Sequence, residues 1–161
     1  MKKILLIATM ACVIGMMTAC FFFHTPPTPP KIDPNDTFVI NVPEKNPEFP
    51  GGPDSLDAYL DRHVRYPQKA LENGIEGKVY VQFIVEKDGS ISDAKVMRDI
   101  VYGSDEADSL ASELGCGAEV IRVLNLNTMP KWEPAVIHGY IRRCYYTIAF
   151  EFTQGKNYPT E

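Results

Sequence analysis

The chain has 161 residues, with 16 Lys and Arg against 21 Asp and Glu. This length accommodates one ordinary domain and excludes a multidomain enzyme. A formal net charge of −5 argues against a nucleic-acid partner, which usually requires a basic surface. The 45% hydrophobic content is sufficient for a core, so a wholly disordered chain is also excluded.

The first residues predict export and attachment to a membrane. A short basic start precedes an uncharged, apolar run from Ile4 to Phe23, which is typical of a signal peptide or an N-terminal anchor. Small residues stand directly before Cys20, and this pattern resembles the lipobox cut by lipoprotein signal peptidase. We predict a signal peptide or membrane anchor at residues 1–19. Cleavage before Cys20 would make this cysteine the lipidated first residue of the protein. We favour this lipoprotein form over an inner-membrane helix.

A Pro-rich tether is predicted to follow at residues 20–46. Closely spaced prolines favour the extended polyproline conformation, which forms no core of its own. A β-prone patch at residues 37–42 interrupts the tether, and it is able to add a strand to the domain behind it.

Two helices are predicted at the start of the folded part. Apolar residues recur at helical spacing, at Leu56, Tyr59, Leu60 and Val64. Asp54 or Ser55 is the candidate N-cap of this helix, and Tyr66-Pro67 is its predicted stop. A second, short helix is expected between Pro67 and Gly74.

Three strands are predicted after these helices. Residues 78–86 alternate, with Val79, Val81, Phe83 and Val85 on one face. Asp88-Gly89 is a hairpin signal, so residues 91–98 are expected to return antiparallel to the first strand. The last strand is predicted at residues 141–152, again with alternating faces.

An acidic stretch and one more helix separate the second and third strands. Residues 99–119 read as a solvated excursion, and residues 118–126 carry an apolar stripe at helical spacing. This order predicts an α+β domain at residues 47–154, in which a small three-stranded antiparallel sheet is packed by two to three helices. Residues 155–161 are predicted to be a tail.

The sequence contains no pattern for catalysis or metal binding. His63 and His138 have no ligand-type residues at metal-site spacing, and no nucleophile elbow or phosphate loop occurs. We therefore expect no enzymatic activity, no metal and no cofactor. In an exported domain Cys116 and Cys144 either form a disulfide or remain two buried thiols.

Several segments, in the same order along the chain, resemble the C-terminal domain family of TonB in its Phe-Pro-Gly-Gly form. They are Pro47 to Gly52, Tyr66 to Ala70, Asn73 to Ile91, Met129 to Pro134 and the closing aromatic strand. The resemblance implies a periplasmic domain that binds an extended peptide of an outer-membrane receptor or another envelope protein. The peptide would add as a strand to the edge made by the last strand, in support of TonB-dependent transmembrane transport.

The resemblance also implies which residues contact the partner. They are His63, Tyr66, Arg143, Cys144, Tyr145, Tyr146, Thr147, Ile148 and Ala149. These residues also have ordinary structural interpretations. For example, Tyr66-Pro67 can be a helix stop without contacting a partner. Trp132 can be a lid over helix and sheet or a platform for a ligand. Edge strands can also pair two copies of the chain into a homodimer.

Three features depart from the family pattern: the lipobox, the short tether and the acidic stretch at residues 101–117. They leave open a second function class. In that class the chain is a structural or assembly lipoprotein of the outer membrane, which keeps the fold without transducing energy.

Overall fold

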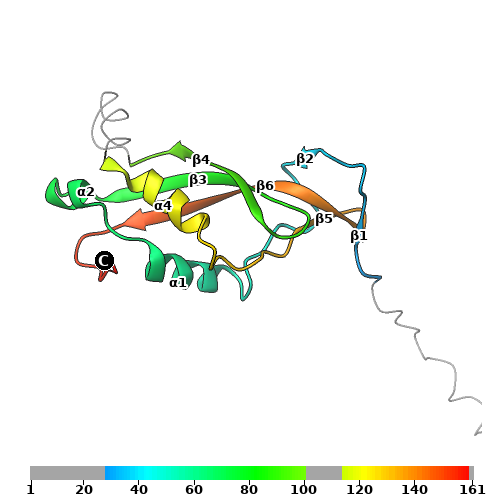
Figure 1. Cartoon of the computed structure of the whole chain (residues 1–161), viewed down its shortest axis with the longest axis horizontal. Helices are drawn as coiled ribbons and strands as arrows, with labels where there is room; N and C mark the ends of the chain where they lie inside the picture. The colour runs from blue at the N-terminus through cyan, green and yellow to red at the C-terminus, as the bar shows by residue number, and fades with distance from the viewer. Residues whose placement is uncertain (1–27, 101–113, 160–161) are drawn as a thin grey trace, which may run out of the picture.

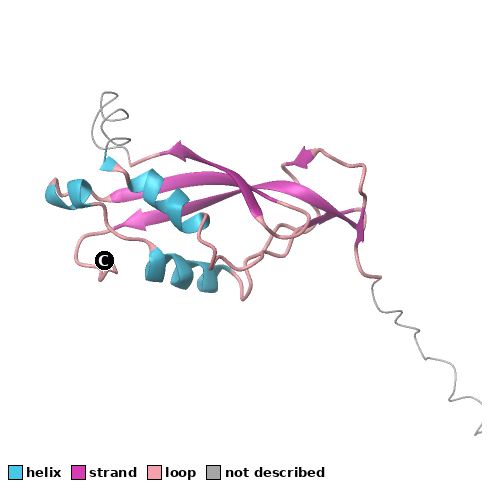
Figure 2. Cartoon of the chain, in the orientation of Figure 1, coloured by secondary structure: helices cyan, strands magenta, loops and turns pink. Residues whose placement is uncertain are grey.

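The structure, a computed structural model, describes residues 28–100 and 114–159. The predicted leader, Cys20 and most of the acidic stretch lie outside these residues. The described part is an elongated, twisted sheet with helices against it (Figures 1 and 2). The short strands β1, β2 and β5 lie at one end, and α2 lies at the other (Figure 1).

The first two helices form where the sequence predicts them, with different boundaries. Helix α1 spans Pro53–His63 and α2 spans Gln68–Glu72. The predicted cap at Asp54 or Ser55 is wrong, because Gly52 occupies the N-cap with a positive φ of 81°. Pro53 can then start the helix, since its fixed φ suits the first helical position.

The three long strands form as an antiparallel unit. They are β3 (Gly77–Val85), β4 (Ile91–Arg98) and β6 (Tyr140–Phe152), with β3 paired between the other two. The hairpin at Asp88-Gly89 is confirmed, since Glu86 N–H donates to the Ser90 carbonyl at 2.8 Å. Helix α4 spans Cys116–Leu124 and packs on β3 and β4.

The prediction of a three-stranded sheet is wrong, because six strands form one sheet within the described residues. The additional strands are β1 (Lys31–Ile32), β2 (Val39–Ile40) and β5 (Ala135–Ile137). All three pair with β6, β1 and β2 in parallel and β5 antiparallel. The β-prone patch at residues 37–42 therefore does add a strand, at β2.

One face of the sheet forms the core. Val79, Val81, Phe83 and Val85 on β3 have no exposed surface, and they lie opposite Phe150, Ile148, Tyr146 and Cys144 of β6. These four β3 residues belong to one apolar cluster that also contains Leu56 and Leu60 of α1 and Val120 and Val123 of α4. The other face of β6 is more exposed, at Thr147 and Ala149.

Candidate functional site

One side of β6 is paired with β3 from Cys144 to Phe152, and the other side is paired over a much shorter stretch. Cys144 lies opposite Val85 of β3 and also opposite Ile40 of β2, so these two neighbours occupy opposite sides of the strand. On the β2 side, pairing with β1 and β2 ends at Cys144. Beyond that point no residue of the described chain pairs with this side of β6. An open edge therefore runs from Tyr145 toward the end of the strand.

This arrangement corrects part of the predicted edge, which covered residues 143–149. Arg143 and Cys144 lie opposite Val39 and Ile40, so the chain's own tether occupies the edge at these two positions. The remaining predicted positions, Tyr145 to Ala149, lie on the open part. Their side chains alternate, since Thr147 and Ala149 are exposed while Ile148 is buried. The available edge is therefore shorter than the sequence implied.

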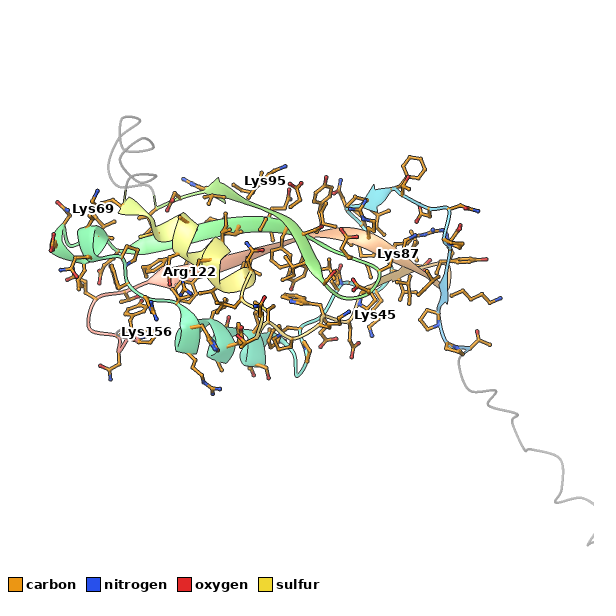
Figure 3. All side chains as sticks on the ribbon, viewed as in Figure 1. Lys45, Lys69, Lys87, Lys95, Arg122 and Lys156 are labelled. Atoms are coloured by element: carbon orange, nitrogen blue, oxygen red, sulfur yellow. The ribbon has the colours of Figure 1, made fainter. Side chains whose placement is uncertain are left out.

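Charged groups hold the tether against β6. The Arg142 guanidinium donates to the Asp36 carboxylate, and the Lys87 ammonium donates to the Asp33 carbonyl at 2.6 Å. Arg143 forms a two-bond pair with Glu86, at 2.7 and 2.8 Å, and reaches the Thr37 carbonyl at 3.2 Å. Lys87 lies at the same end of the molecule as β1 and β2, far from Lys69 (Figure 3). The segment between β1 and β2 is thus held by β6 and by the turn between β3 and β4.

These contacts shift the acidities of the two carboxyl groups. At Asp36 desolvation raises the pKa, but hydrogen bonds from the Phe38 N–H and from Arg142 outweigh it and lower the pKa below the ordinary value. The paired hydrogen bonds from Arg143 likewise lower the pKa of Glu86. A lowered pKa means that the charged carboxylate stabilises the folded state.

We expect Asp36→Asn to release β1 and β2 while the core stays folded, because it removes the charge that Arg142 contacts. Hydrogen exchange at the Val39 and Ile40 amides should become at least several-fold faster. Acid should act in the same way: the Asp36 contribution is present above its unfolded pKa, near 3.8, and is lost as pH falls through the lower folded value.

Asp33→Asn is the matched control, since its carboxylate is 4.0 Å from Arg142 and more exposed. Equal exchange in wild type and Asp36→Asn would show that the carboxylate does not hold the tether.

His63 lies away from the open edge. It is in the last turn of α1, where its ring stacks on Tyr59 with centroids 4.1 Å apart and its Nδ1 lies 2.8 Å from the Tyr59 carbonyl. Its own carbonyl accepts from Arg122 of α4 at 2.9 Å. His63 therefore has a clear structural role within α1.

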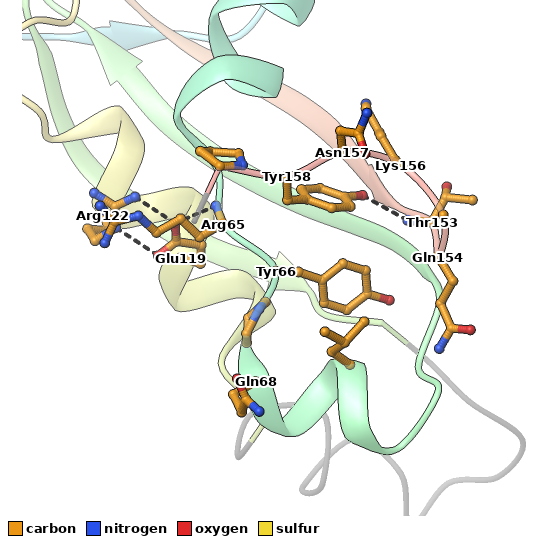
Figure 4. Close-up of a pocket in the computed structure, with 14 residues that line it drawn as sticks. Arg65, Tyr66, Gln68, Glu119, Arg122, Thr153, Gln154, Lys156, Asn157 and Tyr158 are labelled. Carbon is orange, nitrogen blue, oxygen red and sulfur yellow. Dashed lines mark hydrogen bonds and ion pairs between the residues drawn. The ribbon is translucent and has the colours of Figure 1, made fainter. Parts of the chain in front are cut away.

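Tyr66 lines a groove at the opposite end of the sheet from β1. The groove has a volume of about 830 Å³ and is bordered by residues 65–68, by α4 and by the chain after β6 (Figure 4). The Tyr66 hydroxyl donates to the Ile75 carbonyl, and its ring meets Phe152 and Tyr158 edge to face. Burial raises the pKa of Tyr66, which keeps the hydroxyl protonated as a donor. The predicted partner residues thus lie in three places: His63 in α1, Tyr66 in this groove and the remaining residues along β6.

A second pocket lies beside the open edge, and sequence reasoning did not find it. It has a volume of about 250 Å³ and is lined by Lys45 to Phe49, Pro53, Leu56, Trp132 and Tyr146. The Trp132 ring lies 5.2 to 5.5 Å from the rings of Phe49, Phe83 and Tyr146. The sequence allows Trp132 to be a lid or a platform, but nothing in it joins Trp132 to Tyr146.

Gly89 explains how Trp132 reaches this position. The Gly89 carbonyl accepts the Trp132 N–H at 2.8 Å. A Cβ at Gly89 would lie 2.2 Å from the Trp132 carbonyl oxygen, and the glycine φ is +80°. Only glycine fits this close approach, so the hairpin turn between β3 and β4 fixes the backbone of the segment before β5.

The candidate disulfide is not formed in this structure. Cys116 and Cys144 are both free and buried. Burial raises the pKa of the Cys116 thiol to about 12 and also raises that of Cys144. Both are therefore protonated, weakly nucleophilic packing residues at neutral pH. Of the two states that the sequence allowed, the structure has the buried thiols.

Residues 28–100 and 114–159 contain no cluster of three or more His, Cys, Asp or Glu side chains that could hold a metal ion. In the same ranges, no helix combines the length and the apolar character needed to cross a bilayer.

The fold is a mixed α+β domain whose sheet ends in a partly open edge. Residues 62–107 match the family described as Gram-negative bacterial TonB protein C-terminal. Over this segment the match agrees with the resemblance that the motifs indicated. Among solved structures, it is similar to the NMR solution structure of the Helicobacter pylori TonB C-terminal domain, residues 194–285. That match has 22% identity and a TM-score of 0.36, covering 65% of this chain and 95% of the other. No curated protein matches the chain.

Proposed function

We propose that this chain is a membrane-tethered, periplasmic TonB-like module that captures an extended peptide of an outer-membrane transport receptor. The peptide adds as a strand to the open part of β6, and the chain contributes to TonB-dependent transport without catalysing a reaction. The match of residues 62–107 to the TonB C-terminal family supports the transport role. The open edge from Tyr145 to Ala149 supports the mode of binding.

The observation that carries this proposal is the pairing of β2 with β6. Val39 and Ile40 already add in parallel to the same side of the strand. This side therefore accepts an added strand with ordinary backbone geometry. Unpaired N–H and C=O groups along an edge supply affinity for an extended peptide, and neighbouring side chains set its register.

Site-specific photo-crosslinking in the cell envelope tests the proposal. A crosslinking residue replaces Thr147, which is exposed on the open edge, and a second protein carries it at Lys95 on β4, the opposite edge of the sheet. We expect the Thr147 position to capture a periplasmic segment of an outer-membrane receptor and the Lys95 position not to capture it. Capture of a second copy of this chain at Thr147 would instead indicate a homodimer. Receptor capture at Lys95 alone would place recognition on the β4 edge and contradict the proposal.

The membrane attachment gives a separate prediction, because small residues precede Cys20 at the end of an apolar run. Two or more acyl chains anchor a protein stably, whereas one chain is marginal. Labelled fatty acid should enter the wild-type protein and be lost completely in Cys20→Ala. Equal labelling of both proteins would indicate the uncleaved N-terminal anchor.

The alternative function is a structural or assembly lipoprotein of the outer membrane that keeps the fold without energy transduction. The sequence before Cys20 favours it, because a lipid-anchored chain has no helix through the inner membrane with which to engage a motor. Fractionation of the labelled protein into inner and outer membranes separates the two functions. Recovery in the outer membrane, without receptor crosslinks at Thr147, would support the alternative.

A further inference from the structure

The pocket beside Tyr146 is continuous with the edge that β2 already occupies. Tyr146 lies two residues beyond Cys144, where β2 pairing ends, so its backbone is on the open part of the strand. Its ring lies on the helix-covered face, 5.2 Å from the Trp132 ring and 5.9 Å from the Phe83 ring. Tyr146 is therefore a wall of the pocket and also a member of the edge.

Strand pairing fixes where a side chain of an added peptide points. Residues directly opposite each other on neighbouring strands project their side chains from the same face of the sheet. A peptide residue opposite Tyr146 therefore projects toward the helix-covered face, where this pocket lies. The residues before and after it project toward the exposed face with Tyr145 and Thr147. One side chain of the peptide thus meets a pocket, and its two neighbours do not.

The lining of the pocket selects a kind of side chain. Phe49, Leu56 and Trp132 are all buried apolar walls. At the rim Lys45 pairs with Glu133 at 2.8 Å, and Glu48, which also lines the pocket, is exposed to water. Between the buried walls a charged side chain would lose water without finding a buried partner, whereas an apolar one loses nothing.

Trp132 also contains a buried donor without a partner. Trp132 is only 3% exposed, and its Nε1–H has no hydrogen-bond partner in the structure. The rings of Phe49, Phe83 and Tyr146 surround the indole and contain no acceptor atom within the ring. This donor atom is enclosed, so a ligand in the pocket meets the indole ring, and the N–H signal reports on changes around it.

We propose that this pocket recognises the bound peptide by one uncharged, apolar side chain at the position paired with Tyr146. This inference rests on the proposed function and adds to it the property that the partner segment must have. Specificity then comes from the Trp132 pocket, while the backbone edge supplies sequence-independent affinity.

Single amino-acid derivatives test the pocket without a receptor. Trp132 is the single tryptophan, so its indole N–H gives one assignable peak in the ¹⁵N spectrum of the full-length chain. The probes are N-acetyl-leucinamide and N-acetyl-lysinamide at equal concentrations. We expect the leucine derivative to shift the indole peak in a saturable way and the lysine derivative to bind at least about tenfold more weakly.

Two variants locate the binding. Tyr146→Ala removes a pocket wall and should weaken the leucine derivative several-fold, with Tyr146→Leu as its substitute if the fold is lost. Tyr80→Ala is the control, because Tyr80 is a tyrosine of β3 that does not line the pocket. An indole peak that does not move, or that moves equally with both probes or in both variants, overturns the inference. Receptor crosslinks at Thr147 would then still support strand addition, so the two failures are distinguishable.

Discussion

Val81→Asp is expected to unfold the domain. Val81 has no exposed surface, and it lies between Ile148 of β6 and Val96 of β4 in the centre of the sheet. An unpaired carboxylate in this position would destabilise the fold by at least about 4 kcal/mol, which is comparable to the whole stability of a small domain. Thermal denaturation followed by circular dichroism should show no cooperative transition.

Gln82→Asp is the matched control, since Gln82 is the next residue of β3 and points to the more exposed face. It should melt cooperatively, within a few degrees of the wild type. A cooperative transition in Val81→Asp would contradict the assignment of the buried face.

Proline at Tyr145 or Tyr146 should separate folding from binding. Along an edge strand, the backbone N–H groups of successive residues point alternately to the paired neighbour and to the open side. These two adjacent residues lie opposite Ile84 and Phe83 of β3, so one of them donates toward β3 and the other toward solvent. Proline at the first kind of position should cost about 3 kcal/mol or more and unfold the domain. The other variant should stay folded and lose receptor crosslinking at least tenfold.

Tyr145→Ala and Tyr146→Ala control for the loss of each ring. Two unfolded proline variants would mean that both sides of β6 are paired at these positions. A folded proline variant that still crosslinks to the receptor as strongly as the wild type would falsify recognition along this edge. The groove around Tyr66 would then be the next surface to test.

The long elements could be predicted because each has a strong local pattern. The alternation around Val81 and the turn at Asp88-Gly89 defined β3 and β4 to within one residue. The spacing of Leu56 and Leu60 defined α1. Its start was missed because propensity favoured Asp54 or Ser55 as a cap, whereas the positive φ of Gly52 depends on the preceding loop.

β1 and the pocket could not be predicted, and β2 was indicated only by a β-prone patch, because these features depend on contacts between distant residues. β1 and β2 have two residues each, which is too few for any alternation. The ion pair that holds them joins Asp36 to Arg142, 106 positions later. Trp132 and Tyr146 likewise meet only after β6 has paired with β3. A resemblance to a family could identify the last strand as an edge, but not which part of it the tether covers.

The attachment of the tether at β1 limits how far the domain can stand from its membrane. If Cys20 is the anchor, only the chain from Cys20 to Lys31 separates the lipid from the sheet, and its fully extended length is at most about 40 Å. Release of β1 and β2 would extend the free chain to Pro43, because Glu44 and Lys45 stay bonded to Val136, with a limit of about 85 Å. The Arg142 and Asp36 contact therefore sets the radius within which the domain can search for a partner. A partner whose periplasmic segment lies farther than about 40 Å from the anchoring membrane could be reached only after these strands detach.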